Sequence, residues 1–260
     1  MERCFLGMEV AAPWPREFPK GRVLEEENRH LTLAFLGDVG LSSFLEQFST
    51  FPQPPFQMGV AARFDRAVFF PLRSPHVAAW HVAFLEEEEN VFQYQKMVIN
   101  WLKERKIPFR SRFSPHVTIA RPPFAQEEWR ESFVALPLYF KAVTLFESFS
   151  YSKYEARWRL PLLAPFDEKE HTADLAFLVR GESMEQLYLH AALALAFHFP
   201  PMIHYVAREC PENLEELIQK LNALICRVDS EEGCSFKAVS FHGRIEKVGA
   251  LMQWEMIVDV

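Results

Sequence analysis

The chain has 260 residues, 49% apolar and 24% charged, a composition typical of a globular protein with one large domain or two small ones. We expect a cytoplasmic protein with no membrane partner, because no apolar run approaches the roughly 18 residues of a span and the N-terminus lacks secretory-signal features. Residues 1–166 carry 20 Lys+Arg and 19 Asp+Glu (net +1), whereas residues 167–260 carry 8 and 16 (net −8), so the first part can meet a polyanion.

The apolar patterns predict an α+β fold, because strands and helices follow one another throughout. In the first part we expect, in chain order, strands 3–10 and 30–35, helix 41–48, strands 64–70 and 77–84, helix 86–105, strand 117–120, helix 126–134, and strands 139–151 and 158–163. In the second part we expect strand 173–179, helix 183–197, strand 202–207, helix 212–225, and strands 236–241 and 254–258. The segment 160–166 contains two prolines and is the candidate linker between domains 1–164 and 167–260.

One short pattern, His-x-Thr, occurs twice in similar apolar surroundings. It appears as His30 and Thr32 in HLTLAFLG and as His116 and Thr118 in PHVTIAR. Because residues i and i+2 of a strand project from the same face, each copy offers an imidazole beside a hydroxyl, with aliphatic residues on the opposite face. Two such strands across a cleft would place two imidazoles and two hydroxyls around one point.

This set of groups suits the opening of a cyclic phosphodiester by water. The reaction needs a base for the attacking water and an acid for the leaving oxygen, and histidine performs both near neutral pH. The two threonine hydroxyls can hold the non-bridging phosphate oxygens, and a cation can offset the charge that develops. No metal is required, so we expect no cofactor for this reaction. The remaining unpaired histidines (His76, His81, His190, His198 and His204) are interpreted as packing or surface residues.

Residues 1 to about 164 resemble the 2H phosphoesterase superfamily, and within it the RNA 2′,3′-cyclic phosphodiesterases, also called 2′-5′ RNA ligases. The resemblance rests on RCFL at 3–6, HLTLAFLG at 30–37, FSPHVTIAR at 113–121 and VTLFES at 143–148. It implies two related α+β lobes around a central groove, RNA 3′ ends such as those of tRNA as substrates, and a 2′-phosphate product. His30 is then the acid and His116 the base.

Arg121 follows the second motif, where the resembling family also has an arginine. We expect it to turn inward at the end of its strand and contact phosphate, because a guanidinium suits that role. Other basic residues nearby are Lys103, Arg105, Lys106, Arg110 and Arg112, some of which can equally form a solvated helix end.

The second part resembles archease, a small metal-binding protein that helps a GTP-dependent RNA ligase turn over. The likeness lies in HTADL at 171–175, residues 183–196, FKAVSFH at 236–242 and the terminal IVDV. It implies Asp174 and Asp259 as ligands of a divalent cation and the ligase as a partner. Residues 167–260 are short for archease, with the gap between Leu224 and Lys237, where an acidic residue is expected and Asp229 could substitute.

Two other functions stay open at this point. The chain could be a non-catalytic protein that binds RNA ends or assists a ligase. It could also be a phosphodiesterase for 2′-5′-linked oligonucleotides or for cyclic phosphates of ADP-ribose.

Overall fold

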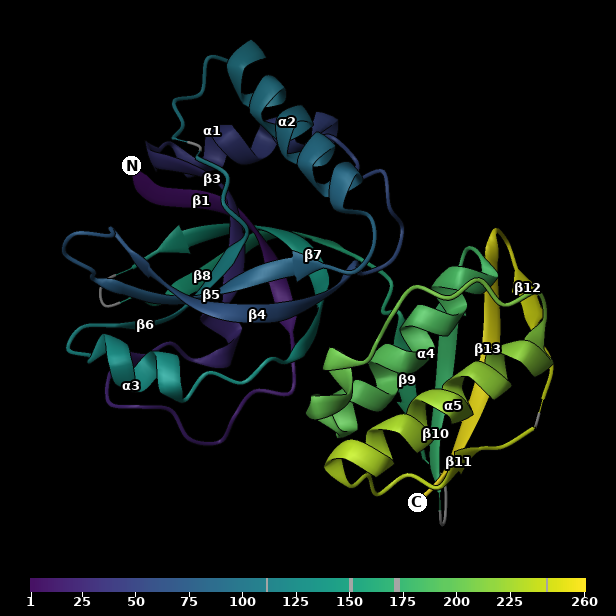
Figure 1. Cartoon of the computed structure of the whole chain (residues 1–260). Coiled ribbons are helices and arrows are strands. Elements are labelled where there is room, and N and C mark those ends of the chain that lie inside the picture. Colours follow the sequence, from purple (N-terminus) through teal and green to yellow (C-terminus); the bar gives the residue numbers. More distant parts are fainter. Residues whose placement is uncertain (111, 150–151, 171–173, 242) are drawn as a thin grey trace.

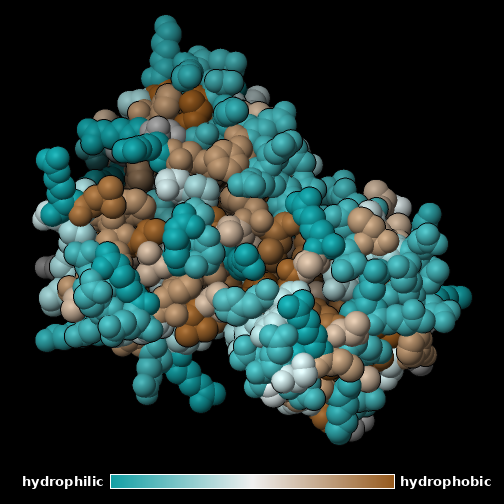
Figure 2. All heavy atoms as spheres, viewed as in Figure 1, coloured by the Kyte–Doolittle hydropathy of each residue, from teal (hydrophilic) through white to brown (hydrophobic). Residues whose placement is uncertain are grey.

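The computed structural model describes residues 1–110, 112–149, 152–170, 174–241 and 243–260. It contains an eight-stranded sheet formed by the first part of the chain and a five-stranded sheet formed by the second (Figure 1). Helices accompany both sheets, which confirms the α+β class. Most of the visible surface is hydrophilic, with smaller hydrophobic areas between (Figure 2). No helix among the described residues is long and apolar enough to cross a membrane.

The first sheet is closed and barrel-like, because the path β1-β3-β6-β5-β4-β7-β8 returns on itself through an additional β1–β7 pairing. The short strand β2 pairs with β6 outside this path. The strands are β1 (Glu2–Ala11), β2 (Arg22–Val23), β3 (His30–Val39), β4 (Ala61–Phe70), β5 (Val77–Phe84), β6 (His116–Arg121), β7 (Pro137–Ser148) and β8 (Tyr154–Pro161).

Within this sheet, two blocks of strands meet along two narrow seams. One block contains β8, β7, β1 and β3, and the other contains β4, β5, β6 and β2. At one seam, β3 meets β6 through the single residue pair Leu31–Val117. At the other, residues 61–63 of β4 pair with residues 137–139 of β7. The two blocks correspond to the pair of lobes expected from the sequence. The first seam, between β3 and β6, brings the two His-x-Thr motifs together.

Three α-helices cover the first sheet: α1 (Leu41–Leu45), α2 (Glu88–Glu104) and α3 (Gln126–Glu131). The described residues of this part also form the 3-10 helices η1 (Glu26–Asn28) and η2 (Glu46–Thr50). Helix α2 is amphipathic, as its sequence predicts, and buries Val91, Tyr94, Gln95, Val98, Trp101 and Leu102. Its apolar face belongs to the same core as Leu31 of β3 and Val117 of β6, so it supports the two strands that carry the motifs.

The second sheet contains β9 (Phe166–Lys169), β10 (Leu175–Gly181), β11 (Ala238–Val239), β12 (Glu246–Val248) and β13 (Leu251–Asp259). Helices α4 (Met184–His198) and α5 (Leu214–Glu232) lie on one face of this sheet (Figure 1). Helix α4 begins as predicted, with the Ser183 hydroxyl accepting a hydrogen bond from the backbone N–H of Gln186 at 3.1 Å. It is apolar almost all round, because it packs against β10 on one side and contacts β7 and β4 of the first sheet on another.

One expected strand of the second part was wrong. Residues 202–207 do not form a strand: Pro200–His204 is a 3-10 helix, η4, which buries Met202 and Ile203. A short apolar run fits either structure, and prolines at its first positions favour a helical start. The charged residues after Phe166, for which no element was expected, belong to strand β9 at the edge of the sheet, where their side chains face solvent.

A buried ionic contact ties the two parts together. The Glu86 carboxylate lies 2.8 Å from Nε2 of His190 and accepts hydrogen bonds from Gln186 and the backbone N–H of Ala61. His190 is fully buried, and its Nδ1 lies 2.6 Å from the carbonyl oxygen of Arg180. The interactions with His190, Ala61 and Gln186 outweigh burial and lower the pKa of Glu86. The packing role expected for His190 therefore extends to holding α4 against the first sheet.

Candidate active site

The register between β3 and β6 places the two His-x-Thr motifs side by side. The strands are antiparallel and pair Leu31 with Val117. One residue away on either side, His30 stands opposite Thr118, and Thr32 stands opposite His116. Directly opposed residues share a face of the sheet, and diagonal neighbours such as His30 and His116 lie about 7–8 Å apart. The structure thus brings the four predicted residues around one point, while Leu31 and Val117 are fully buried on the other face.

Both imidazoles are oriented by the same backbone contact. Nδ1 of His30 lies 2.8 Å from the carbonyl oxygen of Asn28, and Nδ1 of His116 lies 2.7 Å from that of Ser114. A carbonyl oxygen only accepts, so Nδ1 donates in each case and Nε2 of the neutral ring keeps its lone pair. Within the described part of the chain, neither Nε2 atom has a hydrogen-bond partner. Both rings therefore present the same nitrogen for proton transfer.

His30 lies in an aromatic cage. Its ring stacks on Phe5 at 4.5 Å between centroids and lies 5.2 Å from both Phe146 and Tyr154. Burial lowers the pKa of His30 to about 4, helped by the charges of His116 and Arg121 and opposed by the hydrogen bond to Asn28. His30 is consequently neutral at pH 7 in the free protein.

Gly7 makes room for the His30 ring on the neighbouring strand β1. A Cβ at this position would lie 3.2 Å from Cδ2 of His30 and 3.0 Å from the carbonyl oxygen of Leu31. Both distances are shorter than ordinary van der Waals contact, and the carbonyl is fixed by the sheet. The position of His30 thus depends on a residue without a side chain.

His116 is less enclosed than His30. Its ring packs at 4.8 Å against Phe70 and is half-buried. Burial lowers its pKa, and the nearby charges of His81 and Arg121 act in the same direction, against the hydrogen bond to Ser114. The two predicted catalytic histidines therefore share an anchor and differ in their surroundings.

The charge of Arg121 lowers the pKa of both His30 and His116. It is the last residue of β6, is half-buried, and pairs across the sheet with Arg22. It also lines a cavity of about 920 Å³ together with Arg3 and Arg110. The structure thus places Arg121 beside the motifs, where the sequence predicts it.

The wall of this cavity is aromatic as well as basic. Phe5 and Tyr154 separate it from His30, while Phe35 and Phe149 line it and are 54% and 45% exposed. Aromatic faces stack on nucleobases, and guanidinium groups bind phosphates. Sequence reasoning missed Phe35, Phe149 and Tyr154 as site residues, because they come from β3, the segment before β8 and β8, respectively, and converge only in the fold.

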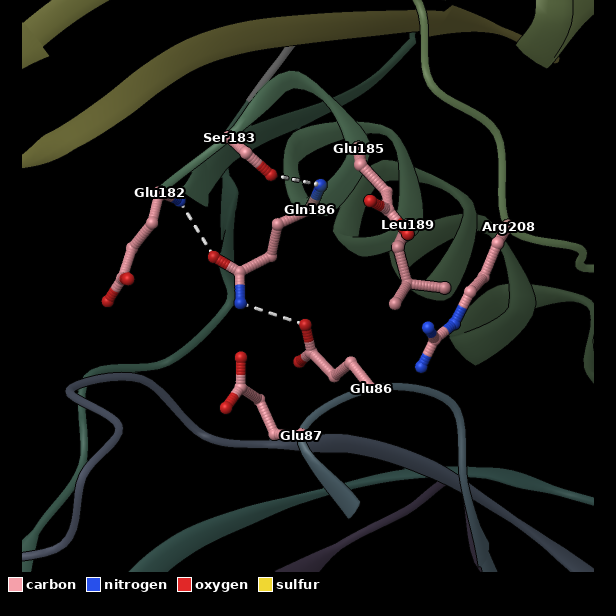
Figure 3. Close-up of a pocket in the computed structure, with 8 residues that line it drawn as sticks. All are labelled: Glu86, Glu87, Glu182, Ser183, Glu185, Gln186, Leu189 and Arg208. Carbon is pink, nitrogen blue, oxygen red and sulfur yellow. Dashed lines mark hydrogen bonds between the residues drawn. The ribbon is translucent and has the colours of Figure 1, made fainter. Parts of the chain in front are cut away.

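A second cavity, of about 430 Å³, lies where the two parts of the chain meet. Figure 3 shows Gln186 at its centre, where it donates to Glu86 and accepts from the backbone N–H of Glu182. Glu87, Glu182 and Glu185 also line it, with Arg208 at one side. Four carboxylates repel phosphate, so this cavity does not suit the phosphate-bearing ligand for which the basic cavity is suited.

Asp259 is the last residue of β13, and Asp174 directly precedes β10. The β10–β13 register pairs Leu175 with Val258, so the two aspartates adjoin the last residue pair of this ladder. The Ser240 hydroxyl donates to Asp259 at 3.3 Å. Among the described residues, no group of three or more His, Cys, Asp or Glu side chains is arranged to hold a metal ion. His171, Thr172, Ala173 and His242 lie outside the described residues, so the metal site stays a prediction.

Comparisons with known proteins give similar structures but no similar sequences. No protein-family model and no curated protein matches the chain. E. coli LigT complexed with 3′-AMP is 22% identical, with a TM-score of 0.43, and the match covers 62% of this chain and 98% of LigT. TT0787 of Thermus thermophilus is 18% identical, with a TM-score of 0.44 over 62% of this chain and 98% of its own. A protein described as a phosphoesterase is 23% identical, with a TM-score of 0.44 over 63% and 99%.

Proposed function

We propose that the chain hydrolyses 2′,3′-cyclic phosphate ends of RNA to 2′-phosphates by acid–base catalysis with two histidines. The observation that carries this proposal is the register of β3 and β6. It sets His30 and His116 diagonally across the Leu31–Val117 pair, with their Nδ1 atoms anchored and their Nε2 atoms available. A separation of about 7–8 Å between the strand positions leaves room for one phosphate between the rings.

The reaction follows from these positions. His116 takes a proton from water through Nε2 as the water oxygen bonds to phosphorus. The bond between phosphorus and O3′ breaks, and His30 donates its Nε2 proton to O3′. The products are a 2′-phosphate and a free 3′-hydroxyl. Thr32 and Thr118 donate hydrogen bonds to the non-bridging oxygens, and Arg121 offsets the negative charge of the transition state.

The acid role demands a change at His30 on substrate binding. Burial lowers its pKa to about 4, so the free protein holds this imidazole neutral at pH 7. A bound phosphate anion beside the ring favours the charged form and raises its pKa. The proposal therefore includes the uptake of a proton by His30 when substrate binds. This uptake follows from the assignment of His30 as the acid and His116 as the base.

The basic, aromatic cavity beside His30 supports RNA as the substrate. Arg3, Arg110 and Arg121 can bind phosphates of the strand that leads to the reacting end. Phe35 and Phe149, both partly exposed, can stack on its bases. The net charge of +1 over residues 1–166 allows such an encounter.

The direct test is incubation of the full chain with a 2′,3′-cyclic nucleotide and with a cyclic-ended RNA in the presence of a chelator. The proposal expects turnover that His30→Asn and His116→Asn each reduce by about 10³-fold. Binding without turnover would instead favour a non-catalytic RNA-end-binding or ligase accessory protein. Faster hydrolysis of 2′-5′-linked oligonucleotides or of ADP-ribose cyclic phosphate would mean that the chain is a phosphodiesterase with a different substrate.

For the second part, we propose the metal-dependent assistance of a GTP-dependent RNA ligase that its resemblance to archease implies. Asp174 and Asp259 adjoin the Leu175–Val258 pair of β10 and β13, and these positions support a shared cation. Calorimetric titration with Mg²⁺, Mn²⁺ and Ca²⁺ should give binding that Asp259→Asn removes. Equal binding by the wild type and Asp259→Asn would contradict the assignment of this ligand.

A further inference from the structure

A third histidine stands beside the paired motifs. His81 on β5 pairs directly with His116 on β6, and Arg66 on β4 pairs in turn with His81. Opposed residues share a face, so a row formed by Thr32, His116, His81 and Arg66 crosses the sheet on the side of the motifs. Sequence reasoning interpreted His81 as a packing or surface residue, because its strand carries no second His-x-Thr pattern.

His81 is held by a hydrogen bond to a carboxylate that a β-bulge places beside it. The β4–β5 register shifts between Phe64 and Arg66, which leaves Asp65 as the extra residue of β4. Its carboxylate lies 2.7 Å from Nδ1 of His81 and 2.7 Å from Nη1 of Arg66. Bulges re-aim side chains in this manner. The side chains of His81 and Asp65 are 23% and 26% exposed, which is too enclosed for a freely rotating surface group.

We propose that His81, held by Asp65, is a positioning residue that keeps His116 in the neutral form that a base requires. When His81 is protonated, its charge lies on the adjacent strand and opposes protonation of His116. The part of the proposal that concerns turnover rests on the proposed phosphodiesterase function. The effect on His116 does not, because it can be measured on the protein alone.

The charges around His116 are consistent with a preference of its ring for the neutral form. His81 faces it from β5, His30 faces it from β3, and Arg121 lies on its own strand. Asp65 and Arg66 on β4 lie behind His81 and pair with each other. The corresponding neighbour of His30 on β1 is Glu9, whose carboxylate is bound by Arg159 and by the Thr144 hydroxyl. Only His116 therefore has a further imidazole at its side within the described chain.

The test is a titration of the His116 ring by NMR in the wild type and in His81→Asn. The asparagine Nδ2 can replace the hydrogen bond of Nδ1 to Asp65 without carrying a charge. Removing one charge on an adjacent strand should raise the titration midpoint of His116 by roughly half a pH unit or more. Arg66→Gln is the matched control, because it removes a charge one strand further away and should give a smaller shift. An unchanged His116 midpoint in His81→Asn would overturn the proposal.

The kinetic readout separates this proposal from the proposed function. With a 2′,3′-cyclic nucleotide, the acidic limb of the kcat/KM profile of His81→Asn should move to higher pH by the same amount as the His116 midpoint. A midpoint that shifts while the acidic limb stays in place would contradict the role of His81 in turnover. Absence of turnover in the wild type would contradict the proposed function and leave the NMR result to decide the effect on His116.

Discussion

The two His-x-Thr motifs have the same sequence pattern and different surroundings. Each histidine is anchored through Nδ1 to the carbonyl oxygen two residues earlier in the chain. His30 is 7% exposed and is caged by Phe5, Phe146 and Tyr154, whereas His116 is half-buried and adjoins Phe70 and His81. The shared anchor fixes which nitrogen is left for proton transfer, and the different neighbours set how readily each ring takes a proton. A repeated motif can thus supply two chemical roles.

The largest expected effect is the loss of either histidine. General acid–base catalysis contributes about 10²–10⁴-fold, so His30→Asn and His116→Asn should each reduce kcat by about 10³-fold. If the rings act on the same phosphate, the double variant should be little worse than either single one, because such effects are not additive. Steady-state kinetics of the three variants measures this. If the loss of kcat in the double variant equalled the product of the two single losses, a reaction shared by the two histidines would be contradicted.

The pH dependence of stability should separate the two histidines. The pKa of His30 is about 4 in the folded chain and near 6.5 when unfolded, so the unfolded state binds more protons in between. Stability should therefore be constant above about pH 6.5 and fall by about 3 kcal/mol as the pH drops to 4.

Urea unfolding at several pH values should show this slope in the wild type and its loss in His30→Asn. His116→Asn should remove a smaller part of the slope, because His116 is less buried. An equal effect of the two substitutions would contradict the difference between the two surroundings.

Gly7→Ala should displace the His30 ring. The added Cβ would lie 3.2 Å from Cδ2 of His30, so the ring must move away from its cage. Misplacement of a catalytic group by about 1 Å can cost roughly 100-fold, and we expect kcat to fall about 10- to 100-fold. Gly40→Ala, whose Cβ would meet only the Ser43 hydroxyl at 3.2 Å, is the control. Unaltered kcat in Gly7→Ala would show that the position of His30 is not critical.

The smallest effect should come from the hydroxyls. Thr32→Val and Thr118→Val each remove one donor to a charged oxygen and should reduce kcat/KM by roughly 10-fold. Because Thr32 stands opposite His116 and Thr118 opposite His30, similar losses are expected from the two positions. Thr50→Val, on η2, should leave kcat/KM unchanged. A loss confined to one threonine would mean that the phosphate does not lie between the strands.

Sequence patterns revealed the groups of the site but not their arrangement. His30, Thr32, His116 and Thr118 were predictable, because i and i+2 spacing on a strand is a local property. Their meeting depends on one residue pair, Leu31–Val117, between strands that are far apart in the chain. His81 could not be identified for the same reason, since its place beside His116 depends on the β5–β6 register and on a bulge at Asp65.

The second part of the chain was harder to predict. Helix α4 was clear from its Ser183 cap and apolar run, but its contacts with β4 and β7 and the Glu86–His190 ion pair are long-range. Strand β9 was missed because its charged residues look like a linker when the edge of the sheet is unknown. Local signals thus identified elements, while tertiary pairing decided which of their residues meet.

The most direct test of the account is ³¹P NMR of the product formed from an RNA that ends in a 2′,3′-cyclic phosphate. Two imidazoles on opposite sides of one phosphorus atom, with His30 placed to protonate O3′, predict a single 2′-phosphate isomer in the presence of a chelator. A 3′-phosphate, a mixture of isomers, or product formed equally well by His30→Asn and His116→Asn would contradict it.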